Sequence, residues 1–152
     1  MLNKVTIQKI KPGDYRVFLS PASVTGLVGL FSWGFISESE IRREGSALRL
    51  VRQGKKSFSS KFNLCEDFTF GWTPRFNELG EVSPEKLNLI KDGALVSTLI
   101  SSRTAKEYSI ESNAASASEG LRSPSVLGGQ LNENEILSNL GTGFYLSNLH
   151  YL

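Results

Sequence analysis

The sequence predicts one α+β domain with a mainly antiparallel β-sheet, one buried helix and a few short helices. Short apolar runs separated by turn residues recur along the chain, which is typical of antiparallel strands. One longer run, residues 21–34, has apolar residues at helical spacing. Repeated parallel βαβ units are not evident. A chain of 152 residues can bury roughly 70% of its unfolded surface, so residues 1–152 are treated as one domain.

The first elements are predicted to be two paired strands. Residues 5–10 alternate between apolar and polar, and residues 15–19 are strand-like. Pro12, Gly13 and Asp14 lie between them and favour a turn. We therefore expect these two strands to pair with each other.

Two helix starts follow. Ser20 before Pro21 is typical of an N-cap followed by proline at the first helical position, which begins the helix over residues 21–34. Ser37 with Glu40 three residues later is a capping-box pattern. It predicts a short helix over residues 38–44, with its charges on a solvated face.

The aromatic residues are expected to be core. Phe68, Phe70 and Trp72 alternate as in a strand, and aromatic side chains at strand spacing usually pack inside, so we expect the same of Trp33. Residues 76–84 are rich in turn formers and read as a connection, in which Arg75 and Glu78 could form a surface pair.

A β-hairpin is the strongest local prediction. Asp92 and Gly93 lie between the apolar runs 87–90 and 94–100, and both positions of a tight hairpin turn favour residues that accept positive φ. Leu95 and Leu99 interrupt the alternation, which indicates burial on both faces. The hairpin should therefore be interior to the sheet.

The candidate site lies after the hairpin. Ser102 can cap a short helix reaching Tyr108, and residues 109–120 then form a small, polar segment that we expect to be a mobile loop off the core. Long loops are often functional, and Arg122 could orient a carboxylate with its planar fork of donors. Glycine allows close backbone approach. The candidate peptide- or partner-binding residues are Ser112, Asn113, Arg122, Gly128 and Gly129. A floppy surface loop with a solvated arginine is an equally good interpretation.

The chain end is predicted to hold one more helix and a strand. Asn132 is a suitable N-cap for residues 133–140, and Gly141 a suitable stop. Phe144, Leu146 and Leu149 have strand character.

Composition excludes several classes. The net charge is +2, from 17 basic and 15 acidic residues, so no nucleic-acid surface is indicated. The longest apolar stretch falls short of a membrane span, and the N-terminus lacks a signal-peptide pattern, so a cytoplasmic location is expected. Cys65 is the only cysteine and His150 the only histidine. The chain can therefore hardly build a zinc site or a Ser-His-Asp triad, and no catalytic or metal residue is assigned.

The order of these pieces resembles the C-terminal domain of the TldD/PmbA family, known as DNA gyrase modulators and including metalloproteases. The similar segments begin with residues 17–21, 45–48 and 62–67, and continue with 76–80, 89–95 and 102–105. Ser112 and Asn113 are similar to the small-residue loop of the family. Residues 135–137 and 143–146 are similar to its late helix and Gly-aromatic strand.

The chain differs from the family pattern at the zinc-binding motif and at two acidic positions. Active members carry a His-Glu-x-x-x-His helix that binds zinc, whereas the corresponding residues here, 29–34, contain no ligand. Asn77 and Leu79 also stand where acids are expected. The chain is thus similar to the PmbA-like branch, and no cofactor is expected in it, zinc being expected only in a TldD-like partner. The family's N-terminal domain is absent, and we expect a fragment or a short member.

Three hypotheses for function follow from this resemblance. The first is a non-catalytic PmbA-like domain of a heteromeric peptide-processing protease, which binds peptide and either a TldD-like subunit or a second copy of itself. The second is a peptidase subunit that uses a zinc site supplied by a partner chain. The third is a regulatory interaction module acting on DNA gyrase.

Overall fold

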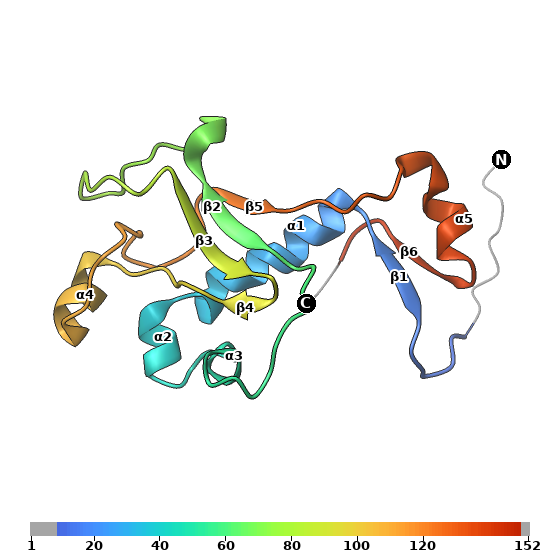
Figure 1. Cartoon of the computed structure of the whole chain (residues 1–152), viewed down its shortest axis with the longest axis horizontal. Coiled ribbons are helices and arrows are strands. Elements are labelled where there is room, and N and C mark those ends of the chain that lie inside the picture. Colours follow the sequence, from blue (N-terminus) through green and yellow to red (C-terminus); the bar gives the residue numbers. More distant parts are fainter. Residues whose placement is uncertain (1–8, 150–152) are drawn as a thin grey trace.

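A four-stranded antiparallel sheet and a separate two-stranded parallel pair form the fold in the computed structural model, which describes residues 9–149. In the larger sheet the order is β4-β3-β2-β5, with β2 at Leu64–Asp67, β3 at Lys86–Lys91, β4 at Ala94–Leu95 and β5 at Pro124–Val126. The smaller pair joins β1, Arg16–Leu19, to β6, Gly143–Leu146. Helix α1 runs between the two sheets (Figure 1). The α+β prediction is confirmed.

Helix α1, Pro21–Leu30, begins as predicted. The Ser20 hydroxyl accepts a hydrogen bond from Ser23 N, and Pro21 occupies the first turn. The helix continues as one π-turn, Phe31–Phe35, which ends where Gly34 adopts φ 91°. Only Ser23 and Val28 of α1 are fully buried, so the helix is more exposed than predicted.

The remaining helices are short. They are α2 at Glu38–Arg42, α3 at Arg49–Arg52, α4 at Ser102–Tyr108 and α5 at Ile136–Leu140, with single 3₁₀ turns at Phe68–Phe70 and Glu133–Glu135. Ser37 caps α2 and Asn132 caps the turn that leads into α5, as predicted. The cap of α4 is Ser101 rather than Ser102.

The predicted hairpin is confirmed. Strands β3 and β4 pair through Ile90 and Leu95, and Asp92 and Gly93 have φ of 50° and 78°. Gly93 is required, because a Cβ there would lie 2.5 Å from Phe58 O. Strand β3 is interior to the sheet, between β4 and β2, as predicted, whereas β4 is an edge strand.

Two other expectations were wrong, and one is not tested. Strand β1 pairs in parallel with β6, which was not predicted, and the strand predicted over residues 5–10 lies mostly outside the described residues, as does His150. Residues 68–70 form a 3₁₀ turn because Asp67 accepts a hydrogen bond from Thr69 N. Trp72 is 85% exposed and Trp33 77% exposed, so these two aromatics are not core.

The core lies between the larger sheet and the helices α1 and α2. Its most deeply buried apolar side chains are Ile36, Leu64, Leu89 and Ile90, and Ala115 belongs to the same cluster. Cys65 is buried and its thiol is free. No helix within residues 9–149 is both long and apolar enough to cross a membrane.

Candidate peptide- and partner-binding site

An open groove of about 530 Å³ lies beside β3 and contains two of the predicted site residues, Ser112 and Asn113. The connection 75–84 forms one wall, and the segments 97–100 and 111–114 form the other. The lining combines apolar side chains with polar ones: Val82, Leu87, Ile100, Ser97, Ser112 and Asn113. Such a mixture suits a ligand that has both apolar groups and hydrogen-bonding groups.

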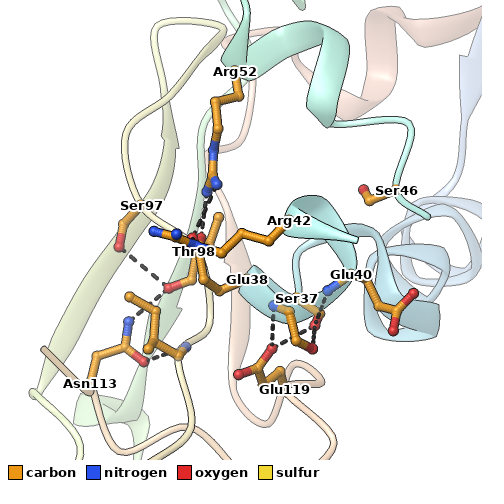
Figure 2. Close-up of polar contacts among 12 residues, drawn as sticks. Ser37, Glu38, Glu40, Arg42, Ser46, Arg52, Ser97, Thr98, Asn113 and Glu119 are labelled. Carbon is orange, nitrogen blue, oxygen red and sulfur yellow. Dashed lines mark hydrogen bonds and ion pairs between the residues drawn. The ribbon is translucent and has the colours of Figure 1, made fainter. Parts of the chain in front are cut away.

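The Asn113 side chain fixes one wall of this groove. Its Oδ1 accepts a hydrogen bond from Ile100 N at 2.9 Å, and its Nδ2 donates to Thr98 O at 2.7 Å. Ser112 Oγ donates to Ile100 O at 3.0 Å. The Asn113 amide thus makes the hydrogen bonds to the backbone of residues 98–100 that a neighbouring strand would otherwise make. Figure 2 shows the contact between Asn113 and Thr98.

The segment after Asn113 packs into the protein. Ala114 and Ala115 are 9% and 5% exposed, and the Ala114 carbonyl accepts a hydrogen bond from Ser83 Oγ at 3.0 Å. Asn77 Nδ2 donates to Ala115 O at 3.1 Å. The prediction of a loop off the core was therefore wrong, because small alanine side chains fit closely against the sheet.

Glu119 joins two helix starts from inside the same segment. Its carboxylate is 1% exposed and accepts four hydrogen bonds, from the backbone N–H and hydroxyl of Ser101, from Ser39 N and from Ser37 Oγ. Burial would raise the pKa of Glu119, but these donors outweigh it and lower the pKa. The N-termini of α2 and α4 are thereby tied to one buried anion. Figure 2 shows the α2 side of this contact, between Ser37 and Glu119.

Glu38 supports the groove wall from behind. It is 4% exposed and accepts hydrogen bonds from Thr98 Oγ1 at 2.6 Å, Arg42 Nε at 2.5 Å and the Arg52 guanidinium at 3.1 Å. Burial alone would raise the pKa of Glu38, but hydrogen bonds from Arg52, Thr98 and Arg42 lower it to about 2. The solvated face predicted for this acid was wrong, because Arg42 from the same helix and two donors from elsewhere in the chain, Arg52 and Thr98, compensate its burial (Figure 2).

Arg122 lies near the groove, but its guanidinium binds other residues of the chain. Its guanidinium donates to Phe76 O at 2.9 Å and to Ser83 Oγ, and it stacks on the Phe68 ring at 4.9 Å. Its backbone N–H donates a hydrogen bond to the Glu66 carboxylate. Burial raises the pKa of Glu66, and the hydrogen bonds from the N–H groups of Ser123 and Arg122 offset only part of this rise. Arg122 thus fastens the connection 75–84 that forms the opposite wall.

The five predicted site residues do not form one cluster. Ser112 and Asn113 line the groove, and Asn113 meets Arg122 at a small internal cavity. Gly128 and Gly129 are exposed beyond β5, where an added Cβ would meet nothing within 4 Å. Arg75 pairs with Glu85 rather than with Glu78. Sequence reasoning missed Glu119, whose only signal was a single acid between a run of small residues and Gly120.

The residues present do not fit a zinc ion. At the position of the family's zinc motif, Ser32 Oγ accepts a hydrogen bond from Leu121 N, and Trp33 points to solvent. Within residues 9–149 no group of three or more His, Cys, Asp or Glu side chains is arranged to hold a metal. The described part of the chain therefore offers no donor set for a family-type centre.

Comparison with known proteins shows which family has this architecture. Residues 12–152 match the family model described as the PmbA/TldA metallopeptidase C-terminal domain. Among curated proteins no sequence matches the chain.

Solved structures share the fold. A protein from Thermotoga maritima named as a modulator of a DNA gyrase is 17% identical with a TM-score of 0.77, covering 95% of this chain and 34% of that one. TldE from Thermococcus kodakarensis is 20% identical with a TM-score of 0.68, covering 90% and 33%. A protein from Bacteroides thetaiotaomicron named as a modulator of DNA gyrase is 15% identical with a TM-score of 0.76, covering 95% of this chain and 32% of that one.

The chain thus spans about a third of the length of these structures, and identities of this size show the fold alone. The match to the family model extends over nearly the whole chain. The chain belongs to the TldD/PmbA family and carries its C-terminal domain.

Proposed function

We propose that this protein is a non-catalytic, PmbA-like domain that binds a partner chain and peptide substrate in a heteromeric peptide-processing protease. The observation that supports this most is the combination of a metallopeptidase-family domain with a sequence that has one histidine and one cysteine. Zinc chemistry in such an assembly belongs to a TldD-like partner, while this chain contributes binding surfaces.

The groove beside β3 is the proposed peptide site. Strand β4 pairs with Ile90 and Lys91, and Val96 N and Ser97 N both donate to Leu89 O. Only residues 86–88 of β3 are therefore left without a described segment paired to them on that side. Val82, Leu87 and Ile100 offer apolar contacts, and Ser97 and Ser112 offer hydroxyl groups. An extended peptide can use both kinds of contact along a sheet edge.

Peptide binding is tested with a matched pair of valine variants. Val82 and Val96 are 63% and 53% exposed, but only Val82 lines the groove. Val82→Asp should weaken binding of a fluorescent, unstructured peptide at least about tenfold, because a carboxylate replaces apolar contact area. Val96→Asp should leave the affinity unchanged in the same anisotropy titration. Equal affinities for both variants, or no peptide binding by the wild type, would contradict the proposal.

Catalysis is tested separately. The isolated chain should contain no stoichiometric zinc by elemental analysis and should not hydrolyse peptides. Stoichiometric zinc with turnover would overturn the non-catalytic role.

A peptidase subunit that borrows zinc from a partner is a second candidate, supported by the metallopeptidase description of the matching family. Adding a zinc-bearing TldD-like subunit should then raise cleavage above that of the subunit alone. No gain would count against it.

The names of two structural neighbours favour a third candidate, a regulatory module that acts on DNA gyrase. The near-balanced charge of the chain gives this candidate little electrostatic support. Failure of purified gyrase to retain the chain in a pull-down would remove it.

A further inference from the structure

A second and separate groove, of about 550 Å³, lies along α1 and is lined only by apolar residues. Helix α1 and the π-turn after it form one wall, and the loop that follows α3 forms the other. The lining includes Val24, Leu27, Val28, Phe31, Phe58 and Phe62.

The α1 wall presents a helical stripe. Val24, Leu27, Val28 and Phe31 are spaced at i, i+3, i+4 and i+7, and of these only Val28 is fully buried. Ridges of this spacing interdigitate well with the side chains of another helix. The shape of this wall therefore favours a helical ligand.

Two phenylalanine rings, Phe58 and Phe62, form the other wall, and both pack against Phe31 of the first wall. The ring of Phe31 lies 6.2 Å from the rings of both Phe58 and Phe62, and those two lie 5.3 Å apart. The loop is held in place because Phe58 N donates to Gly93 O and Gly93 N donates to Phe62 O, at 3.2 and 3.0 Å. The hollow is thus built on a fixed wall.

The loop that forms one wall of the groove carries positive charge without an ion-pair partner in the described chain. The loop 53–63 carries Lys55, Lys56 and Lys61 and contains no acid, and all three lysines are exposed. Within the described chain, the ion pairs involve only arginines and Lys86. Residues 17–37, which include the opposite wall, carry no charge. The segment that forms one wall is therefore positively charged, and the segment that forms the opposite wall is neutral.

We infer that this groove binds an amphipathic helix of a partner chain that has an apolar face bordered by Asp or Glu side chains. The apolar face would fill the hollow, and the carboxylates would meet the three lysines. A concave apolar surface fits a protruding ridge of side chains better than the flat surface of a bilayer. The inference rests on the proposed function in one respect, that the domain acts by binding partners, but it uses a different surface from the peptide groove.

The experiment uses the full chain and three fluorescein-labelled peptides of about 18 residues, long enough to form a helix on binding. One has leucines at helical spacing flanked by Glu, the second has Lys in place of Glu, and the third is a scrambled version of the first. The Glu peptide should bind at least about tenfold more tightly than the other two at low salt, and added salt should weaken it.

Two variants locate the binding. Changing Lys55, Lys56 and Lys61 together to Glu should reverse the preference between the Glu and Lys peptides, and these exposed side chains should not affect folding. Leu27→Ser should weaken both helical peptides about tenfold through the loss of apolar contact, with circular dichroism as the check on folding. Val82→Asp should leave binding of the Glu peptide unchanged, which separates this site from the peptide groove.

Several outcomes would overturn the inference. Equal binding of the Glu and Lys peptides, or no effect of the triple lysine variant, would show that the charges play no part. Concentration-dependent dimerisation abolished by Leu27→Ser would mean that a second copy occupies the groove. Binding of anionic lipid vesicles without preference for the Glu peptide would assign the surface to a membrane.

Discussion

The four-stranded sheet and the β1–β6 pair are held in different ways within one chain. All four residues of β2 are buried, and Glu38, Glu66 and Glu119 are buried around that sheet with hydrogen-bond donors on their carboxylates. No residue of β1 or β6 is fully buried, and Tyr145 is 49% exposed. Buried carboxylates thus occur only where the fold supplies several donors to each.

The smaller pair depends instead on two serines. Ser20 Oγ donates to Ser147 O and Ser23 Oγ donates to Leu146 O, both at 2.7 Å. Because no residue of either strand is fully buried, we expect the pair to open at a lower free energy than the larger sheet.

Glu119→Ala should cause the largest loss, about 3 kcal/mol of unfolding free energy, because the N–H groups of Ser39 and Ser101 lose a charged acceptor inside the protein. Urea unfolding measures it. Glu107→Ala is the matched control, since Glu107 is 41% exposed in its side chain and its pair with Arg43 is a surface one. Equal losses in both variants would mean that Glu119 does not organise this half of the molecule.

Glu38→Gln should cost about 2 kcal/mol, because Arg42 and Arg52 lose a charged partner. It should also change the acid dependence of stability. The pKa of Glu38 is lowered from 4.5 to about 2, so its ionised form stabilises the fold above pH 4.5, and that contribution is lost as the pH falls toward 2.

The measurement is urea unfolding across that pH range. The wild type should lose stability between pH 4.5 and 2 more steeply than Glu38→Gln. Parallel curves for the two proteins would show that Glu38 is not ionised in the groove wall.

Ser23→Ala should have the smallest effect on stability, about 1 kcal/mol, because it removes one hydrogen bond to the Leu146 carbonyl. Its effect should be local. Amides of β1 and β6 should exchange with deuterium faster than in the wild type, while those of β2 and β3 stay unchanged. Thr25→Ala on the exposed side of α1 is the control, since Thr25 Oγ1 bonds only within its own helix. Faster exchange in both sheets would show that the two regions open together.

Much of the local structure was predictable because it depends on residues adjacent in the chain. Asp92 and Gly93 specify a hairpin through their tolerance of positive φ, and Ser20 with Pro21 specifies a helix start. Within the candidate site, Ser112 and Asn113 were predictable from the small-residue segment and the family resemblance. Arg122 was expected to meet a ligand carboxylate, and the structure instead has it fastening a neighbouring loop.

The sequence by itself determined the α+β class, the hairpin, the helix caps and the family, since these rest on local backbone preferences and on the order of segments. Only the tertiary structure decided which charges are buried. Ser37 and Glu119 are 82 residues apart, and Glu38 meets Thr98 from 60 residues away. A carboxylate becomes stable inside the protein only when such distant donors converge on it, and no local pattern in the chain records that convergence.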